Sequence, residues 1–129
     1  MSTVATGNET AVGTVQLYID GVATGDAAKL EQAFHADARM YGAVDGQRYD
    51  IPITEMIQMI AAQPADTGSF GASVRSVDEE GDAAVISIEE HGFWGVLSFV
   101  DYFSLARIDG AWKIVNKTFV QTGGSLPAS

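Results

Sequence analysis

The second half of the chain alternates apolar and polar residues, and this period of two restricts the possible folds more than any other feature. Four segments carry the alternation: "ASVRSVD" (72–78), "AAVISIEEH" (83–91), "GVLSFVDYFSLARI" (95–108) and "AWKIVNKTFVQT" (111–122). Such alternation predicts β-strands that bury one face. The sequences between them, "EEGD", "GFWG" and "DG", are typical of turns. We therefore expect hairpins and antiparallel pairing in this part of the sheet.

The first half of the chain shows helical spacing instead. One apolar stripe consists of Val15, Tyr18, Ile19 and Val22. This stripe predicts a helix from about Glu9 to Val22. Gly25 is expected to end that helix, and Asp26 to cap a second one over "AAKLEQAF" (27–34).

A short strand, "ADARMYG" (36–42), and a turn at "VDGQ" precede a third helix. That helix is expected to follow Pro52, with Thr54 as its cap, and to end at Pro64. Helices followed by a run of strands indicate an α+β fold. We expect three N-terminal helices packed on a curved, mainly antiparallel sheet, as a cone with a pocket between the layers.

Composition excludes several classes of partner. The chain has 129 residues, with 17 acidic against 7 basic ones and a formal net charge of −10. Such a charge repels phosphate backbones and anionic lipids, so we expect no nucleic acid and no membrane partner. The chain has no cysteine, and its start lacks the pattern of a signal peptide, which favours a cytoplasmic location.

Two histidines without ligand spacing and no phosphate-binding glycine loop predict no metal and no cofactor. For the organisation of the chain, we expect a disordered N-terminus over 1–8, one domain over 9–122 and a flexible tail over 123–129.

Asp101 is the one formal charge in "VLSFVDYFSLA" (96–106), a segment predicted to be a central strand. An unpaired buried carboxylate is costly, so Asp101 must be paired, protonated or directed toward a wet space. A structural role would pair it with Arg75, Arg107 or Lys117. An inward Lys117 would ionise it by forming an ion pair.

Two stretches carry a resemblance to a known family: "LEQAFHADARMYG" (30–42) and "DYFSLARIDGAWKIVNKTF" (101–119). They resemble the NTF2-like superfamily, and within it the SnoaL-like or putative lumazine-binding group, with a distant likeness to ketosteroid isomerase-type enzymes. The resemblance implies the α+β cone and pairing of two copies through their sheets, for which outward Val100 and Tyr102 are suited. It implies fold more than function, because such folds host many activities.

The likeness to ketosteroid isomerases also implies site residues. Tyr18 falls on the tyrosine that donates a hydrogen bond to the developing oxyanion, and Asp101 on the protonated aspartate that donates beside it. Gly42 stands where those enzymes carry their general base. The resemblance therefore implies two donors without that base.

Glu90 and His91 are the candidates for a replacement base. If the turn at "GFWG" holds two residues, Glu90 shares a face with Asp101; if it holds three, Glu89 and His91 do. A shift of one residue moves every side chain to the other face of the strand, so both alternatives stay open. In a third alternative, these residues simply form a polar cluster on the outer face.

Several apolar side chains are expected to line the pocket or simply to fill the core. The candidate ligand-binding residues are Met56, Trp94, Phe99, Phe103 and His35. Three functions compete: a domain that binds an apolar or carbonyl-bearing small molecule, an isomerase, dehydratase or cyclase that uses Tyr18 and Asp101 as oxyanion donors, and a structural dimerisation domain. The missing base favours the first.

Overall fold

The computed structural model describes residues 6–127 and contains three helices and six strands. The helices are α1 (Ala11–Thr24), α2 (Ala27–Ala33) and α3 (Ile53–Ala62). The strands are β1 (Phe34–Val44), β2 (Gln47–Pro52), β3 (Asp66–Glu80), β4 (Ala83–Phe93), β5 (Leu97–Ile108) and β6 (Ala111–Gly124). The expected α+β order is present, and β2 is a strand that the sequence pattern did not predict.

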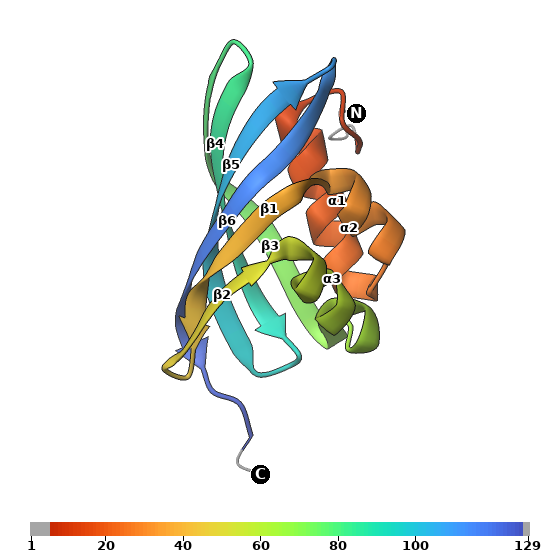
Figure 1. Cartoon of the computed structure of the whole chain (residues 1–129). Coiled ribbons are helices and arrows are strands. Elements are labelled where there is room, and N and C mark those ends of the chain that lie inside the picture. Colours follow the sequence, from red (N-terminus) through yellow and green to blue (C-terminus); the bar gives the residue numbers. More distant parts are fainter. Residues whose placement is uncertain (1–5, 128–129) are drawn as a thin grey trace.

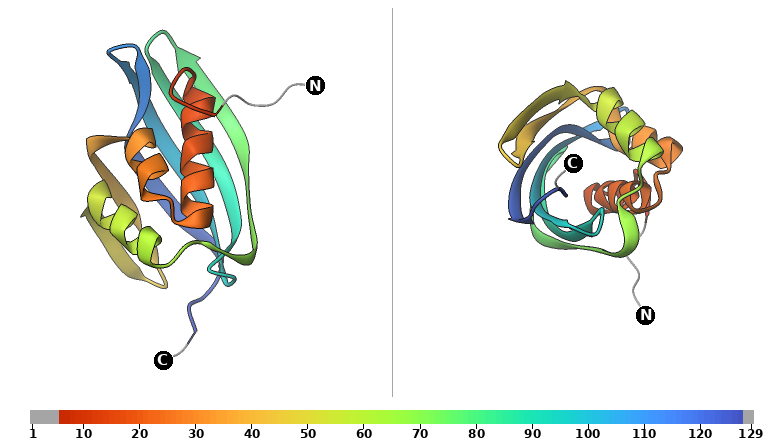
Figure 2. Two further views of the ribbon diagram at one scale, coloured as in Figure 1. Left: turned by 90° about the vertical axis from the view of Figure 1, so that its right-hand side faces the viewer. Right: turned by 90° about the horizontal axis from the view of Figure 1, so that it is seen from below.

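All six strands form one sheet in the order β2-β1-β6-β5-β4-β3. Neighbouring strands pair antiparallel except β1 and β6, which run parallel. The sheet is strongly curved, and the three helices lie on its concave side (Figure 1). Figure 2 shows, in the view from below, how the sheet curls around α1 and leaves the helices as the second layer.

Local sequence explains where the helices begin and end. The Thr10 hydroxyl accepts a hydrogen bond from the Gly13 N–H, so α1 begins at Ala11, two residues later than expected. Gly25 adopts the left-handed conformation at the end of α1, and the Asp26 carboxylate caps α2, as predicted. The expected cap at Thr54 is wrong: α3 begins at Ile53 after Pro52 and has no side-chain cap.

The core lies between the helices and the concave face. Val15, Tyr18 and Val22 of α1 are fully buried, and Ile57 and Ile60 of α3 are nearly so. On the sheet, the inward side chains of β5 alternate with exposed ones, as the period of two predicts. The buried stripe of α1 therefore faces the middle strands, and this packing places Tyr18 against β4 and β5.

The chain ends differ from the expected boundaries. Strand β6 continues to Gly124, and the Leu126 N–H donates to Asp45 Oδ2 at 2.7 Å, so the tail expected from residue 123 begins too early. At the other end, Asn8 Nδ2 donates to the Trp112 carbonyl at 2.7 Å. The rest of the expected disordered ends, 1–5 and 128–129, lies outside the described residues. Between residues 6 and 127, no helix is long and apolar enough to cross a membrane.

Candidate functional site

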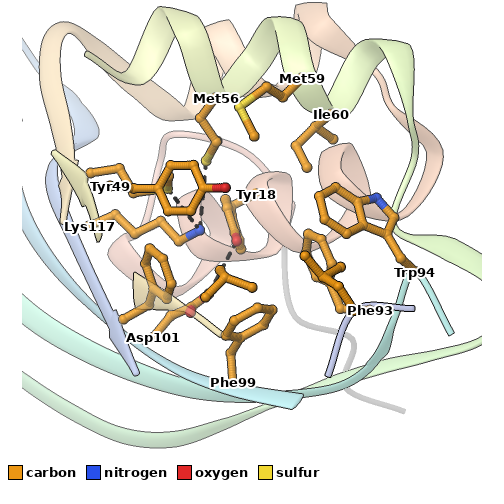
Figure 3. A pocket seen from close by; sticks show the side chains of 14 residues that line it. Tyr18, Tyr49, Met56, Met59, Ile60, Phe93, Trp94, Phe99, Asp101 and Lys117 are labelled. Carbon is orange, nitrogen blue, oxygen red and sulfur yellow. Dashed lines mark hydrogen bonds between the residues drawn. The ribbon is translucent and has the colours of Figure 1, made fainter. Parts of the chain in front are cut away.

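A cavity of about 60 Å³ lies between the helices and the concave face of the sheet. Its fourteen lining side chains come from α1, α3 and five of the strands, together with the β4–β5 turn and Leu126 (Figure 3). All of them are apolar or aromatic except Asp101 and Lys117. The walls therefore favour an apolar molecule, and the few polar groups would fix its orientation.

Asp101 occupies an inward position of β5, opposite Ile88 of β4 and Phe119 of β6, and is almost fully buried. Tyr18 projects from α1 toward the sheet, and its hydroxyl donates to Asp101 Oδ2 at 3.1 Å. The same hydroxyl lies 3.5 Å from Glu90 Oε2. The structure thus brings the two residues of the expected donor pair together and adds Glu90 to them.

Glu90 points inward from β4, where it lies opposite Phe99, and is buried to the same degree as Asp101. Burial and the adjacent Asp101 carboxylate raise the pKa of Glu90 well above its usual range, against the opposing effects of Lys117 and Tyr18. Glu90 Oε1 and Asp101 Oδ1 are buried and have no hydrogen-bond partner among residues 6–127. Burial and the adjacent Asp101 therefore favour the neutral form of Glu90.

Tyr18 is held in its neutral form. Burial, followed by the charges of Asp101 and Glu90, raises the pKa of the Tyr18 phenol well above 10. The ring packs edge-to-face on Phe103 at a centroid distance of 4.9 Å and on Phe34 at 5.8 Å. These contacts fix the ring, so that its hydroxyl remains a donor aimed at the carboxylates.

Lys117 enters the cavity from β6 and is only 6% exposed. Its Nζ donates to Met40 Sδ at 3.6 Å and to Met56 Sδ at 3.7 Å, and lies 5.1 Å from the ring centroids of Tyr18 and Phe119. Among the described residues, neither Lys117 nor Asp101 forms an ion pair within 4.0 Å. Lys117 is inward, but the expected pair with Asp101 is absent.

The other cations considered for Asp101 lie elsewhere. Arg107 pairs with Asp82 at 2.6 Å, and Arg75 donates to the exposed Tyr102 hydroxyl at 3.4 Å. Asp101 therefore belongs to the cavity floor rather than to a surface ion pair.

Met56, Trp94 and Phe99 are among the residues that line the cavity, and the other three candidates, Phe103, His35 and His91, lie elsewhere. Phe103 lies behind the Tyr18 ring in the core, because it is one inward position further along β5. His35 stands at the start of β1, where its Nδ1 accepts from the Asp37 N–H at 3.0 Å. His91 is exposed on the outer face of β4.

Gly42 faces the ring of Phe119. A Cβ atom at Gly42 would lie 2.5–2.6 Å from three ring carbons, which is too close for any side chain. The resemblance to ketosteroid isomerases places their general base at position 42, and a side chain there would displace this ring. Among the described residues, Glu90 of β4 is the other buried carboxyl group beside Asp101.

Sequence reasoning weighed Lys117 only as a partner of Asp101 and missed several wall residues. The missed ones are Met40, Val44, Tyr49, Ile60, Phe93, Phe119 and Leu126, whereas Met59 was considered as a pocket residue beside Met56. The spacing of two between Lys117 and Phe119 was a usable signal, since it places both on one face of a strand. Within residues 6–127, no group of His, Cys, Asp or Glu side chains could hold a metal ion.

Comparison with known proteins identifies relatives of this architecture. The family model described as "Putative lumazine-binding" matches residues 7–120. A crystal structure of an NTF2-like protein from Shewanella baltica OS155 is 25% identical, with a TM-score of 0.78 over 88% of this chain and 92% of that one.

More distant relatives have names that refer to enzymes. Aldolase FrzH of Cladobotryum sp is 23% identical over 108 residues, which cover 84% of this chain and 86% of that protein. A putative ketosteroid isomerase from Parabacteroides distasonis is 14% identical, with a TM-score of 0.64 over 92% of this chain and 96% of that one, and this likeness shows the fold alone.

Proposed function

The chain belongs to the putative lumazine-binding family of NTF2-like proteins, and on this premise we propose that it binds a compact, carbonyl-bearing small molecule in the cavity above Tyr18 and Asp101. The observation that carries the proposal is a polar floor beneath apolar walls. Burying charged side chains costs free energy that a purely structural core avoids. Clusters of this kind concentrate at functional sites.

The dimensions and chemistry of the cavity define the ligand class. About 60 Å³ accommodates a handful of water molecules or one small molecular fragment. A planar ring would lie between the Met56 side chain and the aromatic rings of Phe99 and Trp94, and a larger ligand would extend outward past Trp94. Lys117 Nζ has only weak thioether acceptors, so a ligand carbonyl oxygen would be a better partner.

Titration calorimetry with lumazine tests this proposal, since lumazine is a planar, carbonyl-bearing bicycle. We expect saturable one-to-one binding, and an affinity reduced about tenfold in Lys117→Met, where one hydrogen bond from a charged donor is lost. The matched control is Lys113→Met on the same strand, because Lys113 donates to the Gln32 carbonyl outside the cavity. Absence of heat with lumazine and with smaller cyclic ketones would contradict the proposal.

A second candidate function is catalysis on a carbonyl compound, and the inward Glu90 favours it. Glu90 supplies, next to Asp101, the carboxyl group that Gly42 cannot. Tyr18 and Asp101 would then stabilise oxyanion charge, provided that Asp101 is protonated and Tyr18 turns its proton toward the ligand. The name of the relative Aldolase FrzH agrees with carbonyl chemistry.

Exchange of the α-protons of cyclohexanone in D₂O, followed by NMR, tests the catalytic candidate. We expect exchange faster than in buffer and a loss of about a hundredfold in Glu90→Gln. The adjacent, exposed Glu89 provides the control Glu89→Gln. Equal exchange rates with and without the protein would exclude this second function for simple ketones.

We also propose that two copies pair through the outer face of the sheet. The helices leave this face uncovered (Figure 2), and Val120 (51% exposed) and Tyr102 (46% exposed) lie on it. Apolar β surface of this kind commonly marks an interface.

A further inference from the structure

We propose that Lys117 forms a Schiff base with a small ketone or aldehyde in the cavity, an inference that rests on the proposed entry of carbonyl compounds. Lys117 is the cationic side chain among the cavity-lining residues, and it extends from β6 into the space between Met56 and Tyr18 (Figure 3). Lysines that act as carbonyl nucleophiles lie in apolar surroundings of this type.

The contacts of Lys117 suit a nucleophile rather than a structural cation. A structural lysine in a core is held by a carboxylate or by several carbonyl oxygens, because a buried ammonium needs strong acceptors. Both hydrogen bonds of Lys117 Nζ within the described residues go to thioether sulfur atoms, at 3.6 and 3.7 Å. These are weak acceptors that an incoming carbonyl group can replace.

The surroundings of Lys117 also suit the product. The rings of Tyr18 and Phe119 lie 5.1 Å from Nζ and stabilise a positive charge at this position. An iminium ion carries the same charge as the ammonium ion, so these contacts persist through the reaction. Asp101 lies diagonally across β5 and β6 from Lys117, since Phe103 is opposite Lys117 and Asp101 is opposite Phe119.

The step balances without an added reactant. Lys117 transfers one ammonium proton to Asp101 through a bridging water molecule, because the two groups do not lie within 4.0 Å of each other, and the neutral amine attacks the carbonyl carbon to form a carbinolamine. Asp101 returns the proton to the carbinolamine hydroxyl, which leaves as water while the C=N bond forms. One ammonium and one carbonyl group thus become one iminium and one water, with unchanged total charge.

Tyr18 and Glu90 act as positioning residues in this scheme. The Tyr18 hydroxyl donates to Asp101 Oδ2 and lies 3.5 Å from Glu90 Oε2. They fix the position of the Asp101 carboxyl group, which in this scheme accepts the proton of Lys117. The size of the cavity restricts unhindered entry to small carbonyl compounds, for which acetone serves as the probe.

Reductive trapping tests the inference directly. The full chain is incubated with acetone and sodium cyanoborohydride, and isopropyl groups are mapped on lysine-containing peptides by mass spectrometry. The chain has three lysines, Lys29, Lys113 and Lys117. We expect Lys117 to be modified about tenfold faster than the other two, because the cavity holds the carbonyl beside its nitrogen. This comparison uses the wild-type protein and does not depend on a buried variant folding.

Two arginine variants test whether trapping requires the amine of Lys117 as a nucleophile or only its positive charge, and a third variant tests Asp101. Lys117→Arg keeps the cation and should abolish trapping at this position, whereas Lys113→Arg should leave trapping at Lys117 unchanged. Asp101→Asn should slow trapping about tenfold or more and leave its site unchanged, as expected for loss of a proton carrier.

The outcomes distinguish this inference from the proposed function. Lumazine binding without preferential modification of Lys117 would overturn the Schiff base and leave the binding function standing. Preferential modification of Lys117 without lumazine binding would support the Schiff base and exclude lumazine as a ligand, leaving smaller carbonyl compounds as the ligand class. Equal modification of all three lysines would overturn the inference.

Discussion

The single hydroxyl of Tyr18 donates a hydrogen bond to Asp101. The first role of this residue is therefore to hold the Asp101 carboxyl group in place. The phenol is neutral because burial and two neighbouring carboxyl groups raise its pKa well above 10. Asp101 in turn has no cation within ion-pair distance among the described residues, which makes it dependent on this one donor.

Tyr18→Phe should therefore destabilise the protein. Removal of the hydroxyl leaves the buried Asp101 oxygen without its donor, at a cost of about 1–3 kcal/mol in the free energy of unfolding. Urea denaturation measures the change. Tyr49→Phe is the control, because Tyr49 lines the same cavity and its hydroxyl makes no hydrogen bond among residues 6–127. If the two variants lose equal stability, the Tyr18–Asp101 bond contributes nothing specific.

Glu90 predicts a pH dependence of stability. Burial and Asp101 raise its pKa in the folded protein above the unfolded value of about 4.3. The folded state then binds more protons, so the stability contributed by protonated Glu90 is complete below that pH and is lost as pH rises toward the folded pKa. The loss amounts to about 1.4 kcal/mol for each pH unit between the two pKa values.

Glu90→Gln should remove this loss, because an amide keeps the shape of the protonated acid and cannot ionise. Denaturation between pH 4.5 and 8 should show a falling free energy of unfolding in the wild type and in the exposed control Glu89→Gln, and a flatter profile in Glu90→Gln. Parallel profiles for all three proteins would mean that Glu90 ionises in the folded state as freely as in the unfolded one.

At the scale of elements, the β4–β5 connection shows why part of the site could not be predicted from sequence. The turn holds three residues, 94–96, which by simple counting would send His91 inward. Glu90 and Phe93 both face inward because the pairing shifts between them, at a bulge where Gly92 adopts a φ of 66°. A bulge changes the facing of every residue beyond it, and glycine makes this one possible.

The other elements were also predicted where the sequence signal is local and missed where the structure depends on tertiary contacts. Stripes and caps predicted α1 and α2, because helical spacing and capping chemistry are local. Strand β2 was missed because the alternation in "QRYDIP" is short, with Tyr49 and Ile51 as its only apolar positions before Pro52. It forms as an edge strand paired only with β1. No local sequence pattern predicts that Lys117 contacts the thioether sulfur atoms of Met40 in β1 and Met56 in α3.

Gly42 of β1 packs against the ring of Phe119, which forms part of the cavity wall. In Gly42→Ala the added methyl group would press on the Phe119 ring, which lines the cavity. We expect a loss of about 1–3 kcal/mol in the free energy of unfolding and weaker lumazine binding. In the control Gly123→Ala the nearest atom would lie 3.7 Å away, an ordinary contact. Unchanged stability in Gly42→Ala would show that the ring has another place to go.

At the scale of the whole molecule, the parallel pairing of β1 with β6 places the first strand beside the last. This pairing sets Met40 opposite Lys117 and so completes the cavity with a residue from the N-terminal half. The antiparallel hairpins follow from turn sequences, whereas this contact depends on how the helices pack. The curved sheet then directs its concave face to the cavity and leaves its convex face without a second layer (Figure 2).

That convex face carries the last prediction, which concerns the number of copies. In a pair related by a twofold axis, one substitution enters the interface twice, so Val120→Glu would add two like charges to chains that each already carry −10. Light scattering should give a dimer mass for the wild type and a monomer mass for Val120→Glu. Val96→Glu is the control, since Val96 lies in the β4–β5 turn. A monomer mass for the wild type would show that the convex face is not an interface between two copies, and that each cavity functions in a single chain.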